Sequence, residues 1–93
     1  MHKNENKIPV YFLPGLAANP SIFKNIKLDT NRFEIYYLEW MIPFDEESIS
    51  DYALRLCSKI KHSNAVLVGV SFGGIVAQEM NLVHNFRKIV IIS

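Results

Sequence analysis

The stretch Ala65–His84 reads AVLVGVSFGGIVAQEMNLVH and contains the strongest structural signal in the chain. An apolar run enters the glycine-rich segment and an apolar segment of helical period leaves it, so the pattern predicts a strand, a sharp corner and a helix. Ser71 stands at the corner, at the carboxyl end of the strand, where the first free N–H groups of the helix point. At this position the Ser71 hydroxyl would be exposed and close to free N–H groups, as a nucleophile requires.

The glycines around the serine fit the same corner. Gly69 and Gly73 lie two residues before and two residues after Ser71. A serine at so tight a bend must take a strained backbone conformation, and side chains at positions 69 and 73 would collide across the bend. Gly74 would let the helix lie close to the sheet. The G-x-S-x-G spacing, in this strand-turn-helix context, is typical of a nucleophile elbow.

Two other interpretations of this stretch compete with the elbow. A dinucleotide-binding G-x-G-x-x-G pattern would fall on Gly69, Ser71 and Gly74, but it lacks the middle glycine that lets the backbone approach a pyrophosphate. The acid expected about 20 residues further on is also absent, because residues 88–93 read KIVIIS. The other interpretation is a structural turn in which the serine only caps the helix. The elbow is favoured over both.

Size and composition indicate one small globular domain. The chain has 93 residues, of which 20% are charged, and its formal net charge of +1 gives no hint of a nucleic-acid or membrane partner. We expect residues 1–7 to form a mobile tail and residues 8–93 to form the domain. The first apolar run, about six residues long, is too short for a signal peptide or a membrane span, so a cytoplasmic location is expected. No metal site or cofactor is indicated, and Cys57 is expected to be a packing residue.

The rest of the chain alternates strands with helices, which predicts an α/β fold with a parallel sheet and right-handed crossovers. The common doubly wound pattern suggests about four strands in the spatial order 2-1-3-4, flanked by helices. The predicted strands are Ile8–Leu13, Phe33–Leu38, Ala65–Val70 and Arg87–Ile92. The predicted helices run from Ser21 to Ile26, from Ser48 to about His62 and from Phe72 to about His84. The last of these is apolar nearly all round and should be the more buried.

With these features in place, the chain resembles the N-terminal half of an α/β-hydrolase. The resemblance rests on residues 69–74 (GVSFGG), on residues 10–16 (VYFLPGL) and on the order of strands and helices between them. It covers nearly all of the chain and implies a partial α/β-hydrolase fold with Ser71 as the catalytic nucleophile.

The resemblance also implies an oxyanion hole made of backbone N–H groups. One donor would be the residue after the nucleophile, Phe72. The other would come from the loop after the first strand and falls on Leu16, or less directly on Ala17. Pro14 departs from the family's commoner pattern, in which a histidine precedes the glycine of this loop.

The base and the acid of a serine triad are missing from the sequence as read. In the family they follow the serine in the order acid, then histidine. The only histidine after Ser71 is His84, at the far end of the predicted helix and so about 20 Å away. His62 and His2 are expected at the same far edge, as solvated residues. We therefore expect a catalytically incomplete chain: a truncated chain, an abbreviated gene product or one part of a split enzyme.

The leading functional hypothesis is an esterase-like serine hydrolase that cleaves an ester, thioester or amide through an acyl-enzyme. An apolar acyl substrate is one explanation for the apolar loops at the carboxyl ends of the strands; core packing or the seat of a lid domain explains them equally well. The loop residues concerned are Leu16, Phe23, Trp40, Met41, Ile42 and Phe44.

Two alternative functions remain open. One is an acyltransferase, which shares the elbow and differs in what attacks the acyl-enzyme. The other is an interaction module that pairs through the open edge of the strand at residues 87–92. This edge is apolar and carries no interior charge, so self-association or pairing with a missing C-terminal half is expected.

Overall fold

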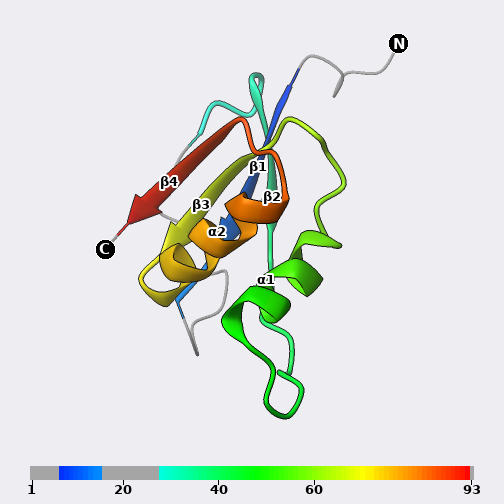
Figure 1. Cartoon of the computed structure of the whole chain (residues 1–93). Coiled ribbons are helices and arrows are strands. Elements are labelled where there is room, and N and C mark those ends of the chain that lie inside the picture. The colour runs from blue at the N-terminus through cyan, green and yellow to red at the C-terminus, as the bar shows by residue number, and fades with distance from the viewer. Residues whose placement is uncertain (1–6, 16–27, 93) are drawn as a thin grey trace.

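The computed structural model describes residues 7–15 and 28–92 of the chain. The elements, in chain order, are β1 (Ile8–Leu13), β2 (Phe33–Tyr37), α1 (Ile49–Cys57), β3 (Val66–Val70), α2 (Phe72–Val83) and β4 (Lys88–Ile92) (Figure 1). Each strand agrees with its predicted range to within one residue at either end. The predicted helix from Ser21 to Ile26 and residues 1–6 of the predicted tail lie outside the described residues.

The four strands form one parallel sheet in the order β2-β1-β3-β4, as predicted. In the register between β1 and β3, Val10 lies opposite Val66 and Leu13 lies opposite Gly69. The carboxyl ends of these two strands are therefore level. As a result, the segment that leaves β1 and the corner that follows β3 meet at the same edge of the sheet.

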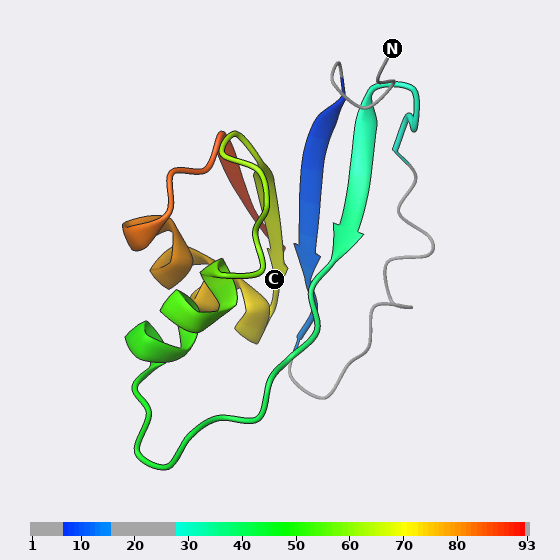
Figure 2. The same cartoon turned by 90° about the vertical axis from the view of Figure 1, so that its right-hand side faces the viewer.

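The two helices of the described residues, α1 and α2, pack on one face of the sheet (Figure 2). Side chains of a strand alternate between its two faces, so Tyr11 and Leu13 of β1 join the core under the helices while Val10 and Phe12 face the other way. The core under the helices is completed by buried residues of β3, α1 and α2, among them Leu67, Ala53, Leu56, Val76, Ala77 and Met80. A second, smaller cluster lies on the opposite face.

Helix α2 is less enclosed than its composition predicts. It has five buried residues against three in α1, but Ile75, Leu82 and Val83 are 52%, 75% and 55% exposed. Since α1 and the sheet both contact the same side of α2, its outer side meets no other described element. The expectation that α2 is the more buried of the two helices is confirmed, although one side of it leaves apolar residues exposed.

Helix α1 begins as predicted and ends earlier. The Ser48 Oγ accepts a hydrogen bond from the Asp51 N–H at 3.0 Å, which caps the helix. After Cys57 the backbone changes to the tighter bonding of a 3₁₀ turn, with Ser58 N–H donating to Arg55 O and Ile60 N–H to Cys57 O. The Ser58 hydroxyl also donates to Arg55 O. The helix therefore stops before His62, which lies on the loop that leads to β3.

Candidate functional site

Ser71 occupies the corner between β3 and α2 in a strained conformation. Its φ is 57° and its ψ is −120°, and among the described non-glycine residues only Glu46 also has a positive φ. The residue is exposed, and its side chain makes no hydrogen bond that caps α2. The structural interpretation, in which the serine serves as a helix cap, therefore lacks its defining contact. A strained, exposed serine is what the elbow interpretation requires.

The glycines allow an approach that no side chain would permit. A Cβ at Gly69 would lie 2.4 Å from the carbonyl oxygen of Gly73. A Cβ at Gly73 would lie 2.5 Å from the carbonyl oxygen of Leu13 and 2.7 Å from that of Pro14. These are backbone atoms that cannot move aside independently. The first turn of α2 therefore packs directly on the end of β1.

The segment after β1 also reaches the serine itself. A Cβ at Gly15 would lie 3.5 Å from the Cβ of Ser71, in ordinary van der Waals contact. Leu16 and Ala17, whose N–H groups were expected to complete the oxyanion hole, lie outside the described residues. Phe72 is the first residue of α2, so its N–H has no partner within the helix. The structure thus places one of the two expected donors next to Ser71.

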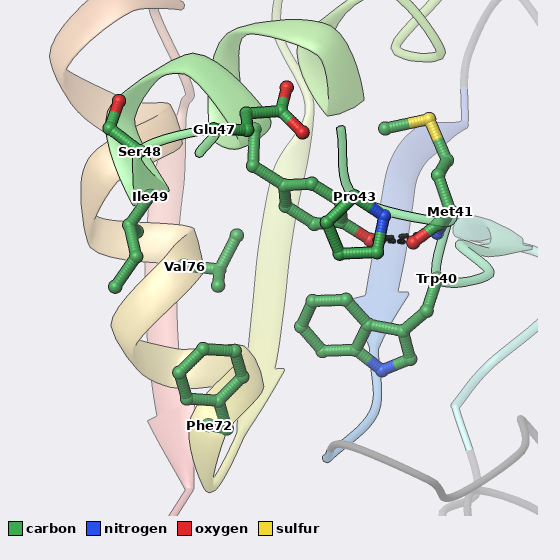
Figure 3. A pocket seen from close by; sticks show the side chains of 9 residues that line it. Trp40, Met41, Pro43, Glu47, Ser48, Ile49, Phe72 and Val76 are labelled. Carbon is green, nitrogen blue, oxygen red and sulfur yellow. Dashed lines mark hydrogen bonds between the residues drawn. The ribbon is translucent and has the colours of Figure 1, made fainter. Parts of the chain in front are cut away.

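A pocket of about 170 Å³ opens beside Phe72 (Figure 3). Nine residues line it, drawn from the segment between β2 and α1, from the start of α1 and from the first turns of α2. Six of the nine are apolar in type: Trp40, Met41, Pro43, Ile49, Phe72 and Val76.

The apolar loop residues predicted near the site divide into three groups. Trp40 and Met41 line the pocket, whereas Ile42 and Phe44 do not and are 87% and 63% exposed. Leu16 and Phe23 lie outside the described residues.

Trp40 connects the pocket to the segment after β1. Its indole N–H donates a hydrogen bond to the carbonyl oxygen of Gly15 at 3.1 Å. Its ring centroid lies 5.6 Å from that of Phe72 and 5.9 Å from that of Tyr52. The Trp40 side chain therefore links the wall of the pocket to Gly15, which lies beside Ser71.

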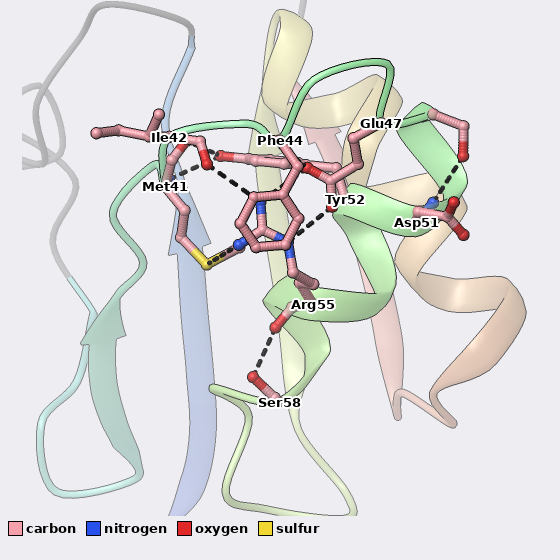
Figure 4. Close-up of polar contacts among 9 residues, drawn as sticks. Met41, Ile42, Phe44, Glu47, Asp51, Tyr52, Arg55 and Ser58 are labelled. Carbon is pink, nitrogen blue, oxygen red and sulfur yellow. Dashed lines mark hydrogen bonds and ion pairs between the residues drawn. The ribbon is translucent and has the colours of Figure 1, made fainter.

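Two residues of α1 that the sequence did not point to hold the segment between β2 and α1 (Figure 4). The Tyr52 hydroxyl accepts from the Met41 N–H at 2.7 Å and donates to the Met41 carbonyl oxygen at 2.8 Å. The Arg55 guanidinium donates to both carboxylate oxygens of Glu47, at 2.7 and 2.8 Å, and to the carbonyl oxygen of Ile42 at 3.2 Å. The spacing of three residues, which puts Tyr52 and Arg55 on neighbouring positions of one helix face, is the only signal that could have found them.

The ion pair between Arg55 and Glu47 also affects the ionisation of the Glu47 carboxyl. The Glu47 side chain is only 5% exposed. The hydrogen bonds from Arg55, helped by the N–H of Phe44, lower the pKa of the Glu47 carboxyl below its ordinary value. The carboxylate therefore stays charged and engaged, and it does not act as a free acid or base in the pocket.

The described histidines lie far from Ser71. His62 precedes β3 and His84 precedes β4, whereas Ser71 follows β3. His62 was expected to be a solvated helix end, but it is half-buried and its Nδ1 lies 2.7 Å from the Tyr11 hydroxyl, which also accepts from the Lys61 N–H. His84 is also half-buried, with its ring centroid 4.5 Å from that of Phe86. His2 lies outside the described residues.

The described residues offer neither a metal site nor a reactive cysteine. Within residues 7–15 and 28–92, no group of histidine, cysteine and acidic side chains is arranged to hold a metal ion. Cys57 is half-buried against the core, its Sγ 3.7 Å from the carbonyl oxygen of Met80, and burial raises the pKa of its thiol. It is a packing residue, as expected.

No family model, curated protein or solved structure significantly matches this chain. The described helices include none long and apolar enough to cross a membrane. The structure defines the chain as an α/β protein with a four-stranded parallel sheet.

Proposed function

We propose that this chain carries the nucleophile of a serine hydrolase of α/β-hydrolase type. The observation that supports the proposal best is the backbone of Ser71, a non-glycine residue held at a φ of 57° at a strand-to-helix corner, exposed and without a capping bond. Strain of this kind persists only where the surrounding structure imposes it, and it is concentrated at functional sites.

In the proposed reaction the Ser71 Oγ attacks the carbonyl carbon of an ester, thioester or amide. The hydroxyl proton passes to a base, and the negative charge that forms on the carbonyl oxygen accepts hydrogen bonds from the N–H groups of Phe72 and Leu16. Expulsion of the alcohol, thiol or amine leaves an acyl-enzyme, which water then hydrolyses. His62 and His84 lie at the other end of the strands, so neither of these described histidines is placed to act as this base.

Reaction with a fluorophosphonate tests the nucleophile directly. We expect Ser71 to be phosphonylated faster than Ser63, an exposed serine in the turn before β3 that serves as an internal control. Without a base the reaction should be slow, because positioning and an oxyanion hole alone account for roughly 10³–10⁴-fold over water. Peptide mass spectrometry of the wild type and of Ser71→Ala identifies the modified residue. Equal labelling of Ser71 and Ser63 would contradict the proposal.

The edge of the sheet favours a second candidate function. Strand β4 is paired only with β3 among the described strands, and Ile91 and Ile92 are 44% and 38% exposed. An interaction module would use this edge and would not need a reactive serine. Absence of any preferential labelling at Ser71, together with association through β4, would favour this function over the hydrolase.

A further inference from the structure

The pocket beside Phe72 has the size of a small organic ligand. Its volume is about 170 Å³, while an apolar cavity of about 150 Å³ in another protein binds benzene. A ligand portion of about six carbon atoms would therefore fill it. The pocket is a hollow open to the surface, so such a group could enter without local unfolding.

The polar groups of the lining are already occupied by the protein itself. Glu47 accepts from Arg55 and from the Phe44 N–H, and Tyr52 both donates to and accepts from the backbone of Met41. The Trp40 N–H donates to Gly15, and the Ser48 Oγ accepts from Asp51. A ligand would thus meet mainly carbon, since the polar atoms of the wall are held in other bonds. This favours an apolar group over a sugar, a phosphate or a peptide amide.

The location of the pocket connects it to the proposed reaction. Phe72 forms part of the wall and directly follows Ser71, so their Cα atoms are about 3.8 Å apart. The indole N–H of Trp40, on the facing wall, donates to the carbonyl oxygen of Gly15, and a Cβ at Gly15 would lie 3.5 Å from the Cβ of Ser71. Figure 3 shows the rings of Phe72 and Trp40 at one end of the pocket, near the start of α2. Ser71 itself is not part of the lining, so use of this space requires that a chain attached at the Ser71 Oγ reaches past Phe72.

We infer that the pocket receives the acyl chain of the substrate, and that this chain is an apolar group of about six carbons. The inference rests on the proposed function and deepens it, because it names the substrate class. The wall is also fixed in advance: the hydrogen bonds of Tyr52 and Arg55 hold the segment from Trp40 to Glu47 before any ligand binds. Such preorganisation lowers the entropic cost of binding, because the wall does not have to become ordered when the ligand enters.

Trp40 is the only tryptophan of the chain, so its fluorescence reports on this pocket alone. We would titrate the protein with primary alcohols from ethanol to decanol and follow the emission of Trp40. We expect a saturable change, with the dissociation constant falling about fourfold per added methylene until the chain reaches about six carbons, and no further gain beyond that length.

Two variants of α1 test whether the alcohols bind in this pocket. Ile49 lines the pocket and is 45% exposed, and Ile49→Asp puts a charge at its rim in the first turn of the helix, where an acid is compatible with folding. It should weaken hexanol binding by about tenfold or more, since a charge at the rim opposes burial of an apolar group. Leu54 is 54% exposed and is not part of the lining, so Leu54→Asp is the matched control and should bind like the wild type. Circular dichroism verifies the fold of both variants.

The alcohol titration needs no reaction at Ser71. It therefore tests the apolar pocket independently of the proposed nucleophile. Alkyl fluorophosphonates of two to ten carbons, compared by their labelling rate at Ser71, should show the same optimum as the alcohols. Preferential labelling of Ser71 at all chain lengths, without a response of Trp40, would overturn the acyl pocket and keep the nucleophile. A Trp40 response with the six-carbon limit, without labelling, would support an apolar pocket and overturn the hydrolase. No dependence of Trp40 emission on chain length would overturn the inference by itself.

Discussion

At Ser71 a side chain occupies a conformation that suits glycine. A φ of 57° with a ψ of −120° is that of the first central residue of a type II′ turn, a position dominated by glycine. A non-glycine residue held in such a region costs on the order of 1–3 kcal/mol. The fold therefore carries a local cost at the residue to which we assign the chemistry.

This cost leads to a prediction for Ser71→Gly. Glycine relieves the strain but adds freedom to the unfolded chain, so the net gain should be about 1 kcal/mol in the free energy of unfolding. Ser71→Ala keeps the Cβ and should gain nothing. Ser63→Gly, at an exposed turn, is the matched control and should be neutral or destabilising. Urea unfolding measures all three, and equal stability of Ser71→Gly and Ser71→Ala would show that the corner is not strained.

At the scale of single elements, helix α1 fixes the segment that precedes it. Tyr52 and Arg55 bind the backbone of Met41 and Ile42, and Arg55 pairs with Glu47, whose side chain is 5% exposed. The guanidinium also lies 3.8 Å from the ring centroid of Phe44. The pocket wall therefore depends on the charge of one carboxylate.

That dependence should appear in the response of stability to pH. Arg55 lowers the pKa of Glu47 in the folded protein, so the carboxylate contributes stability above its unfolded pKa of about 4.3 and loses it as the pH falls through the lower folded pKa. Between pH 6 and pH 3 the wild type should lose more stability than Glu47→Gln. Arg55→Gln removes the cause and should flatten the profile in the same way. Urea midpoints across this range provide the measurement; parallel profiles for the three proteins would contradict the role of the pair.

The sequence predicted those parts of the fold that depend on local pattern. The bounds of β1 and β3, the corner at Ser71 and the start of α1 at Ser48 follow from hydrophobic period, glycine spacing and capping, all of which act over a few residues. The strand order followed from the usual topology of alternating strands and helices. The residues of the corner, Gly69, Ser71 and Gly73, could be named for the same reason.

The remaining features depend on contacts between distant residues. His62 is paired with Tyr11, 51 residues away, and the helical sequence pattern that extends to His62 carries no sign of this contact. The end of α1 was misplaced because the Ser58 hydroxyl competes for the carbonyl of Arg55. The role of Arg55 in holding the pocket wall required the path of the segment that contains Glu47, which has no periodic signal.

At the scale of the whole molecule, the sheet has two outer strands of different character. Strand β2 carries Glu34 in its interior, and an interior charge is one of the devices that protect sheet edges. Strand β4 carries a charge only at its first residue, Lys88, and exposes Ile91 and Ile92. Among the described strands, nothing pairs with the outer side of β4. Of the two edges, β4 is the one suited to pairing with a second copy of the chain.

We therefore expect the protein to associate through β4, with the strands of two copies continuing one sheet. Ile91 is 44% exposed and its Cγ2 lies above Gly74, so a lysine there keeps an aliphatic stem against the helix while bringing a charge to the edge. Ile91→Lys should raise the dissociation constant by about tenfold, because it places like charges across a symmetric contact and removes two apolar partners. Leu82→Lys, on the exposed side of α2, is the matched control and should leave association unchanged. Sedimentation velocity over a range of protein concentrations compares both variants with the wild type. A wild type that stays monomeric, or an equal effect of the two lysines, would show that the edge of β4 is not the contact and that some other part of the chain protects it.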